Sequence, residues 1–124
     1  MPEAFIPTLY LNHRCPFCLK LMIYIAQAGL WDTVRLRIFE PGSAEHEATK
    51  AELAPYFSKV SFPTAEVAPG DFRNETDALI AYFESRSGKK ATDMPLLDYY
   101  ATGVFKQVTE LFQENMRLKG GAGG

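Results

Sequence analysis

Residues 10–20 read YLNHRCPFCLK and contain both cysteines of this 124-residue chain, Cys15 and Cys18. An apolar stretch from Phe5 to Leu11 precedes them, and a strongly helical stretch follows. A cysteine at the junction of a strand and a helix N-terminus meets unpaired backbone N–H groups and the positive end of the helix dipole. Both effects stabilise the thiolate, so we expect Cys15 to be a reactive thiol.

Length, composition and charge favour one compact globular domain. The chain is 47% hydrophobic and 13% aromatic, enough for a packed core, and its formal net charge of -2 gives no electrostatic reason to expect nucleic acid or an anionic membrane as a partner. The start, residues 1–4, lacks the features of a signal peptide, and no run of about 18 apolar residues could span a bilayer. Two cysteines so close together cannot join distant segments, as secreted disulfide-rich domains require. We therefore expect a cytoplasmic protein.

Hydrophobic patterning predicts alternating strands and helices. Strands are expected at 5–11, 34–39, 64–67 and 71–73, the last two forming a hairpin around Pro69-Gly70. Helices are expected from Pro16 to about residue 28, from Ser43 to before Pro55, and from an N-cap at Thr76 to about residue 87. The predicted order is β-α-β-α-β-β-α.

The segment beyond residue 90 is predicted to be a helical extension. Apolar residues repeat at helical spacing to about Leu118, which indicates one long helix within residues 91–119, and the glycine-rich residues 120–124 are expected to form a mobile tail. We expect the aromatic side chains of this helix to pack against the core; they are Tyr99, Tyr100, Phe105 and Phe112. If they instead left an apolar patch exposed, a homodimer through the C-terminal helix would be favoured.

The motif Cys-Pro-Phe-Cys-Leu-Lys, between a strand and a helix, resembles the active-site segment of dithiol glutaredoxins. Residues 5–87 resemble the thioredoxin-fold domain that glutaredoxins share with the N-terminal domains of glutathione transferases. Phe62-Pro63-Thr64 stands where this superfamily has a cis-proline, and Glu75-Thr76-Asp77 resembles the acidic and hydroxyl pair that receives glutathione. The resemblance implies an α/β thioredoxin-like fold over residues 1–90 with an additional C-terminal helix.

The resemblance also implies roles for individual residues. Cys15 and Cys18 would be catalytic, and glutathione would run from Cys15 past the backbone of Phe62 to the helix that begins at Thr76. Asn12 stands where many glutaredoxins have a basic residue, so Arg14 would supply positive charge instead. The glutathione-binding residues so implied are Arg14, Pro16, Phe17, Lys59, Phe62, Pro63, Glu75, Thr76 and Asp77.

These features predict a glutathione-linked thiol–disulfide oxidoreductase that acts on disulfide-containing or glutathionylated proteins, with glutathione as co-substrate. Conjugation chemistry is not expected, because the segment after Lys90 is much shorter than the second domain of a transferase. Two alternatives stay open: a stand-alone glutathione-binding module without redox turnover, and a redox sensor. No metal is expected, since two thiols and His13 leave a tetrahedral zinc site one ligand short, although an iron–sulfur cluster bridged by Cys15 between two chains stays open.

Overall fold

The computed structural model describes residues 5–123, with side chains through Leu118. The strands in this range are β1 (Thr8–Asn12), β2 (Arg35–Phe39), β3 (Thr64–Ala68) and β4 (Asp71–Asn74). The helices are α1 (Pro16–Gln27), α2 (Ala44–Leu53), α3 (Thr76–Ser87), α4 (Pro95–Thr102) and α5 (Val104–Gly123). Short 3-10 turns occupy η1 (Trp31–Thr33), η2 (Ala54–Tyr56) and η3 (Ala91–Asp93). The predicted β-α-β-α-β-β-α order is confirmed as far as α3.

The four strands form one mixed sheet in the order β2-β1-β3-β4. Strand β1 pairs in parallel with β2, with Thr8 opposite Arg35, so α1 serves as the crossover connection that a parallel pair requires. Strands β3 and β4 pair antiparallel as the predicted hairpin, with a register shift between Glu66 and Ala68. This mixed sheet with its crossover helix is a thioredoxin-like α/β fold, as predicted.

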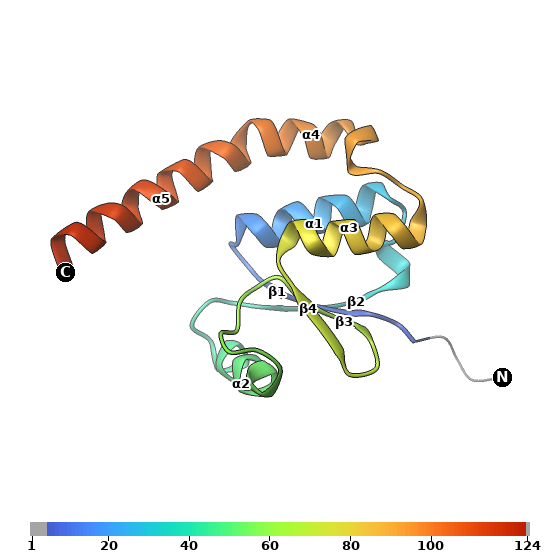
Figure 1. Ribbon diagram of the computed structural model, residues 1–124, viewed down its shortest axis with the longest axis horizontal. Coiled ribbons are helices and arrows are strands. Elements are labelled where there is room, and N and C mark those ends of the chain that lie inside the picture. Colours follow the sequence, from blue (N-terminus) through green and yellow to red (C-terminus); the bar gives the residue numbers. More distant parts are fainter. Residues whose placement is uncertain (1–4, 124) are drawn as a thin grey trace.

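Helices cover both faces of the sheet. Figure 1 shows α1 and α3 on one face, α2 on the other, α4 on the outer side of the α1 and α3 layer, and α5 extending from α4 beyond that layer. The core lies mainly between the sheet and the α1 and α3 layer, and its buried side chains include Leu9, Leu11, Leu21, Tyr24, Ile25, Ala65, Val67, Leu79, Ile80 and Phe83. Among the described helices, none combines the length and apolar character needed to cross a membrane.

Local sequence signals fix most helix ends. Ser43 caps α2, as predicted, because its hydroxyl accepts a hydrogen bond from the backbone N–H of His46 at 3.1 Å. Gly88 ends α3 in the left-handed conformation, with φ of 73°. The prediction that Thr76 is the N-cap of α3 is wrong. Glu75 occupies the cap position with φ of 73°, and Thr76 is the first helical residue.

The C-terminal extension differs from the single long helix predicted. It contains α4 and α5, separated at Gly103, where a Cβ atom would lie 3.0 Å from the carbonyl oxygen of Tyr99. Tyr100 is buried, whereas Tyr99 is 75% exposed and Phe112 is 56% exposed, so the expected core packing of these last two is wrong. Tyr99 and Tyr100 are consecutive residues of α4 and point about 100° apart around the helix, so Tyr100 faces α1 while Tyr99 faces away from it, and Phe112 lies in the later turns of α5.

Helix α5 continues to Gly123, beyond the end predicted near Leu118. The mobility expected for residues 120–124 stays a prediction. Residues 1–4 and Gly124 lie outside the described residues, as do the side chains after Leu118.

Candidate redox site

Cys15 lies at the junction between β1 and α1. Cys15 is the N-cap of α1 and has an extended backbone. Pro16 takes the first helical position, where a backbone N–H would have no partner within the helix, so the lack of this group in proline costs no hydrogen bond. The Sγ atom of Cys15 accepts a hydrogen bond from the backbone N–H of Cys18 at 3.4 Å. The sequence prediction that a thiol stands at a helix N-terminus is therefore confirmed in the geometry.

The two thiols have opposite electrostatic environments. A hydrogen bond from the Cys18 side chain lowers the pKa of Cys15 to about 6, against the opposing effect of burial and with help from the backbone N–H groups of Cys18 and Phe17. The same hydrogen bond, together with burial, raises the pKa of Cys18. At pH 7 a thiol with such a pKa is roughly nine-tenths thiolate, the form in which a thiol can act as a nucleophile.

Exposure separates the two thiols as well. Cys15 is partly exposed, whereas Cys18 is 2% exposed and belongs to the core. The backbone N–H of Asn12, at the end of β1, donates to the Cys18 Sγ atom at 3.4 Å. Neither thiol forms a disulfide within the described residues.

A cavity of about 390 Å³ lies beside the first turn of α1, between that turn, the approach to β3 and the start of α3. The peptide bond between Phe62 and Pro63 is cis, as the resemblance implies. The Thr76 hydroxyl donates to the carbonyl oxygen of Phe17 at 3.3 Å, which ties the start of α3 to the first turn of α1. Six of the predicted glutathione-binding residues line this cavity: Phe17, Phe62, Pro63, Glu75, Thr76 and Asp77.

The start of α3 gives this cavity an anion-binding end. The first backbone N–H groups of a helix have no partner within the helix, and the dipole places partial positive charge there. A carboxylate is the ligand that such an end favours. The positive φ of Glu75 turns the chain sharply into α3, so that Thr76 and Asp77 follow it into the cavity wall.

Three predicted binding residues lie elsewhere. Arg14 is exposed and lies near Glu40, with 3.8 Å between Nε and Oε2, and it makes no contribution to the lowered pKa of Cys15. Pro16 and Arg14 line a different, apolar cavity of about 320 Å³ that Cys15 also lines. Lys59 is exposed and, among the described residues, lines neither of these cavities.

Three residues that line the two cavities near Cys15 were not identified from the sequence: Lys20, Tyr100 and Phe105. The Lys20 ammonium lies 2.9 Å from Asp77 Oδ1 and 4.9 Å from the ring centre of Phe105, which in turn packs edge-on against Phe17. Lys20 could have been found, because it lies three residues after Phe17 on the same face of α1. Phe105 and Tyr100 come from the extension, and no spacing in the sequence brings them to this site.

Helices α4 and α5 form one wall of the apolar cavity beside Cys15. Its apolar residues from these helices are Tyr100, Val104 and Val108, and they face Leu19 and Met22 of α1. The extension therefore contributes directly to the surroundings of Cys15. Within the described residues, no three His, Cys, Asp or Glu side chains come together as a candidate metal site.

Two solved structures that share this fold are described as glutathione S-transferases. One, from the Antarctic clam Laternula elliptica, has 22% identity and a TM-score of 0.50, and the match covers 68% of this chain and 36% of that chain. Another, a possible glutathione S-transferase from Rhodopseudomonas palustris, has 20% identity and a TM-score of 0.50, covering 65% of this chain and 40% of that one. The matched region thus spans well under half of each of those proteins. No protein-family model matches the sequence, and no curated protein matches it.

These likenesses define the class of fold. The chain has the thioredoxin-like fold found in glutathione S-transferases, and it carries a Cys-Pro-Phe-Cys motif at the strand–helix junction of that fold.

Proposed function

We propose that this protein is a glutathione-linked thiol–disulfide oxidoreductase, similar to glutaredoxins. The observation that carries the proposal is that the two neighbouring thiols differ in exposure and in pKa. Cys15 is partly exposed and has a pKa of about 6, whereas Cys18 is buried and its pKa is raised. A low pKa at an accessible sulfur is what thiol–disulfide exchange near neutral pH requires of the attacking group.

The reaction proceeds by two exchanges. The Cys15 thiolate attacks one sulfur of a substrate disulfide, the new S–S bond joins Cys15 to that sulfur, and the other sulfur leaves as a thiolate that takes up a proton. Glutathione thiolate then attacks the mixed disulfide and releases Cys15 as thiolate, with glutathione oxidised to its disulfide when the bound group is glutathione. The burial of Cys18 supports this route over direct resolution by Cys18.

Glutathione binding is proposed for the 390 Å³ cavity between the Phe17 turn and the start of α3. One carboxylate of the tripeptide would lie on the free N–H groups at Thr76 and Asp77, next to the Lys20 ammonium. Its backbone would lie beside Phe62 and the cis-proline. Phe105 would close the side of the cavity that faces α5.

Partners and location follow from the same proposal. The substrates would be disulfide-containing or glutathionylated proteins in the cytoplasm, where thiols are kept reduced. The exposed apolar face of α5 supports a homodimer through this helix; its residues are Val104, Val108, Leu111, Phe112 and Met116.

The decisive experiment is a coupled assay with hydroxyethyl disulfide, glutathione, glutathione reductase and NADPH. We expect turnover by the native protein, loss of nearly all turnover in Cys15→Ser, and retained turnover in Cys18→Ser. Mass spectrometry after incubation of the reduced protein with glutathione disulfide should show a glutathione adduct on Cys15. Glutathione binding without adduct or turnover would instead support a binding module, and oxidation without turnover would support a sensor.

A further inference from the structure

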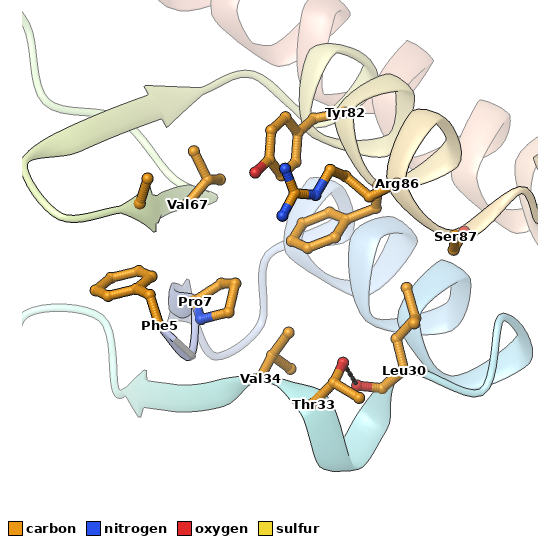
Figure 2. A pocket seen from close by; sticks show the side chains of 11 residues that line it. Phe5, Pro7, Leu30, Thr33, Val34, Val67, Tyr82, Arg86 and Ser87 are labelled. Carbon is orange, nitrogen blue, oxygen red and sulfur yellow. Dashed lines mark hydrogen bonds between the residues drawn. The ribbon is translucent and has the colours of Figure 1, made fainter. Parts of the chain in front are cut away.

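A third cavity, of about 360 Å³, lies at the opposite end of α1 and α3 from the reactive thiol. Each helix has 12 residues, so the two ends of α1 are roughly 18 Å apart. The segment before β1, the turn after α1, the end of β3 and the last turns of α3 form its walls. Figure 2 shows Phe5 and Pro7 facing Tyr82 and Arg86 across this space. A ligand here could not contact Cys15.

The lining is mostly apolar and carries one cation. Arg86 is the single charged residue among those that line the cavity, and its guanidinium lies 5.6 Å from the ring centre of Tyr82. Arg73 lies over the same ring at 4.9 Å but is already paired with Asp71, at 3.1 Å. Arg86 forms no ion pair with any of the described residues. An arginine with unused donors at the edge of an apolar cavity is suited to a carboxylate.

Two of the three hydroxyl groups in the lining are already hydrogen-bonded, whereas that of Tyr82 makes no hydrogen bond to a described residue. Thr33 donates to the carbonyl oxygen of Leu30 at 2.6 Å, a bond drawn in Figure 2, and the Ser87 hydroxyl is 3.2 Å from that of Tyr24. Neither therefore requires a polar ligand group. The cavity therefore offers an apolar space with one positively charged donor, Arg86, and one uncharged donor, the Tyr82 hydroxyl.

We propose that this cavity binds a monocarboxylate with an apolar aromatic or alkyl body, with the carboxylate on Arg86 and the body between Pro7, Val34 and Val67. The volume is within the range of small-molecule sites, and few polar groups in an apolar lining are typical of them. The site is independent of the proposed redox function, because it shares no lining residue with either cavity near Cys15.

The first test uses 4-phenylbutyrate and its uncharged amide as probes in a two-dimensional NMR titration of the full chain. The acid should shift the amide signals of Thr33, Val67 and Arg86 and leave those of Cys15 and Thr76 unchanged. The amide should bind roughly tenfold more weakly, as expected for the loss of a hydrogen bond between charged groups. Equal affinity for acid and amide, shifts confined to the cysteine end, or no binding up to millimolar probe would each overturn the proposal.

Two arginine variants provide a matched comparison. Arg86→Gln should weaken binding of the acid roughly tenfold and leave binding of the amide unchanged. Arg73→Gln removes the same charge from a second arginine beside the Tyr82 ring, one that does not line the cavity, and should keep the native affinity. Equal weakening by both substitutions would show that net charge, rather than a site at Arg86, attracts the acid, and would overturn the proposal.

Discussion

The Tyr100 hydroxyl donates a hydrogen bond to the backbone carbonyl oxygen of Pro16 at 2.8 Å, although 84 positions separate the two residues. Pro16 is the first residue of α1 and directly follows the reactive thiol. Burial raises the pKa of Tyr100, and the nearby charge of Cys15 raises it further. The C-terminal extension is therefore hydrogen-bonded to the helix turn that follows Cys15.

Tyr100→Phe removes this hydrogen bond and keeps the ring. We expect the free energy of unfolding to fall by about 1 kcal/mol, the usual net contribution of one such bond. Urea denaturation of the native protein and of the variant measures this difference in the free energy of unfolding. Tyr99→Phe is the matched control, because Tyr99 is highly exposed and should change stability by less than about 0.5 kcal/mol. An equal effect of both substitutions would contradict the proposed role of the bond.

Cys18 is predicted to set the reactivity of Cys15. Cys18→Ala removes the side-chain donor that contributes most to the lowered pKa of Cys15, so that pKa should rise from about 6 toward its ordinary value of 9.0. Cys18→Ser keeps a hydroxyl donor and should produce a smaller rise. The pH dependence of iodoacetamide alkylation at Cys15 measures the pKa. If the alanine variant kept the native profile, the hydrogen bond would not be the cause.

The thiols also predict how stability depends on pH. Because the pKa of Cys15 is lower in the folded chain than in the unfolded chain, the unfolded state binds more protons between about pH 6 and 9, and stability rises with pH there. This contribution is lost as pH falls through about 6. The raised pKa of Cys18 acts oppositely, so stability should fall again above pH 9.

The expected rise is about 2 kcal/mol, which is less than the full shift would give because Cys15 is partly exposed. Denaturation of the native chain and of Cys15→Ser across this pH range measures it. The serine variant should lack the rise. A rise of the same size in both proteins would assign it to other groups.

Thr76 is predicted to hold together the two helices that line the proposed glutathione cavity. Thr76→Val removes the hydrogen bond to the Phe17 carbonyl at nearly constant volume, and should lower stability by about 1 kcal/mol. It should also raise the KM for glutathione, because the start of α3 is no longer held against α1. Thr76→Ser keeps the hydroxyl and should restore both values. Failure of serine to restore the KM would point to the lost methyl group instead.

Helix α5 offers a test of association. Leu111 lies on the exposed apolar face and Gln113 on the polar face, about 200° away around the helix. Leu111→Lys should convert a dimer into a monomer in sedimentation velocity, whereas Gln113→Lys adds the same charge and should not. A native protein that sediments as a monomer at high concentration would exclude the proposed dimer.

The core of the fold could be predicted because its signals are local. Apolar alternation marks the strands, and Ser43 and Gly88 mark helix ends by mechanisms that act within one turn. The division at Gly103 could not be predicted, because apolar residues keep helical spacing across it and one glycine disfavours a helix by only about 1 kcal/mol. The cap at Glu75 was missed because an acidic residue with positive φ is uncommon.

In the candidate site, too, some features could be predicted from the sequence and others could not. The thiol chemistry of Cys15 follows from its place at a strand–helix junction, and the cis bond at Pro63 follows from the family resemblance. The positions of Lys20 and Phe105 depend on the packing of α5 on α1, which no short-range pattern encodes. Arg14 was assigned by its proximity in sequence, yet its side chain turns toward Glu40.

Because the helical segment is interrupted at Gly103, helix α5 has two different surroundings along its length: α1 at its start and solvent further along. Phe105, just after Gly103, touches the first turn of α1, while the apolar residues one to three turns further along are uncovered. If a second protomer bound the exposed later turns of α5, the whole helix would become more rigid, including the turn that carries Phe105. Affinity for glutathione and the extent of dimerisation would then both increase with protein concentration. A helix that made no contact with α1 could not couple the two.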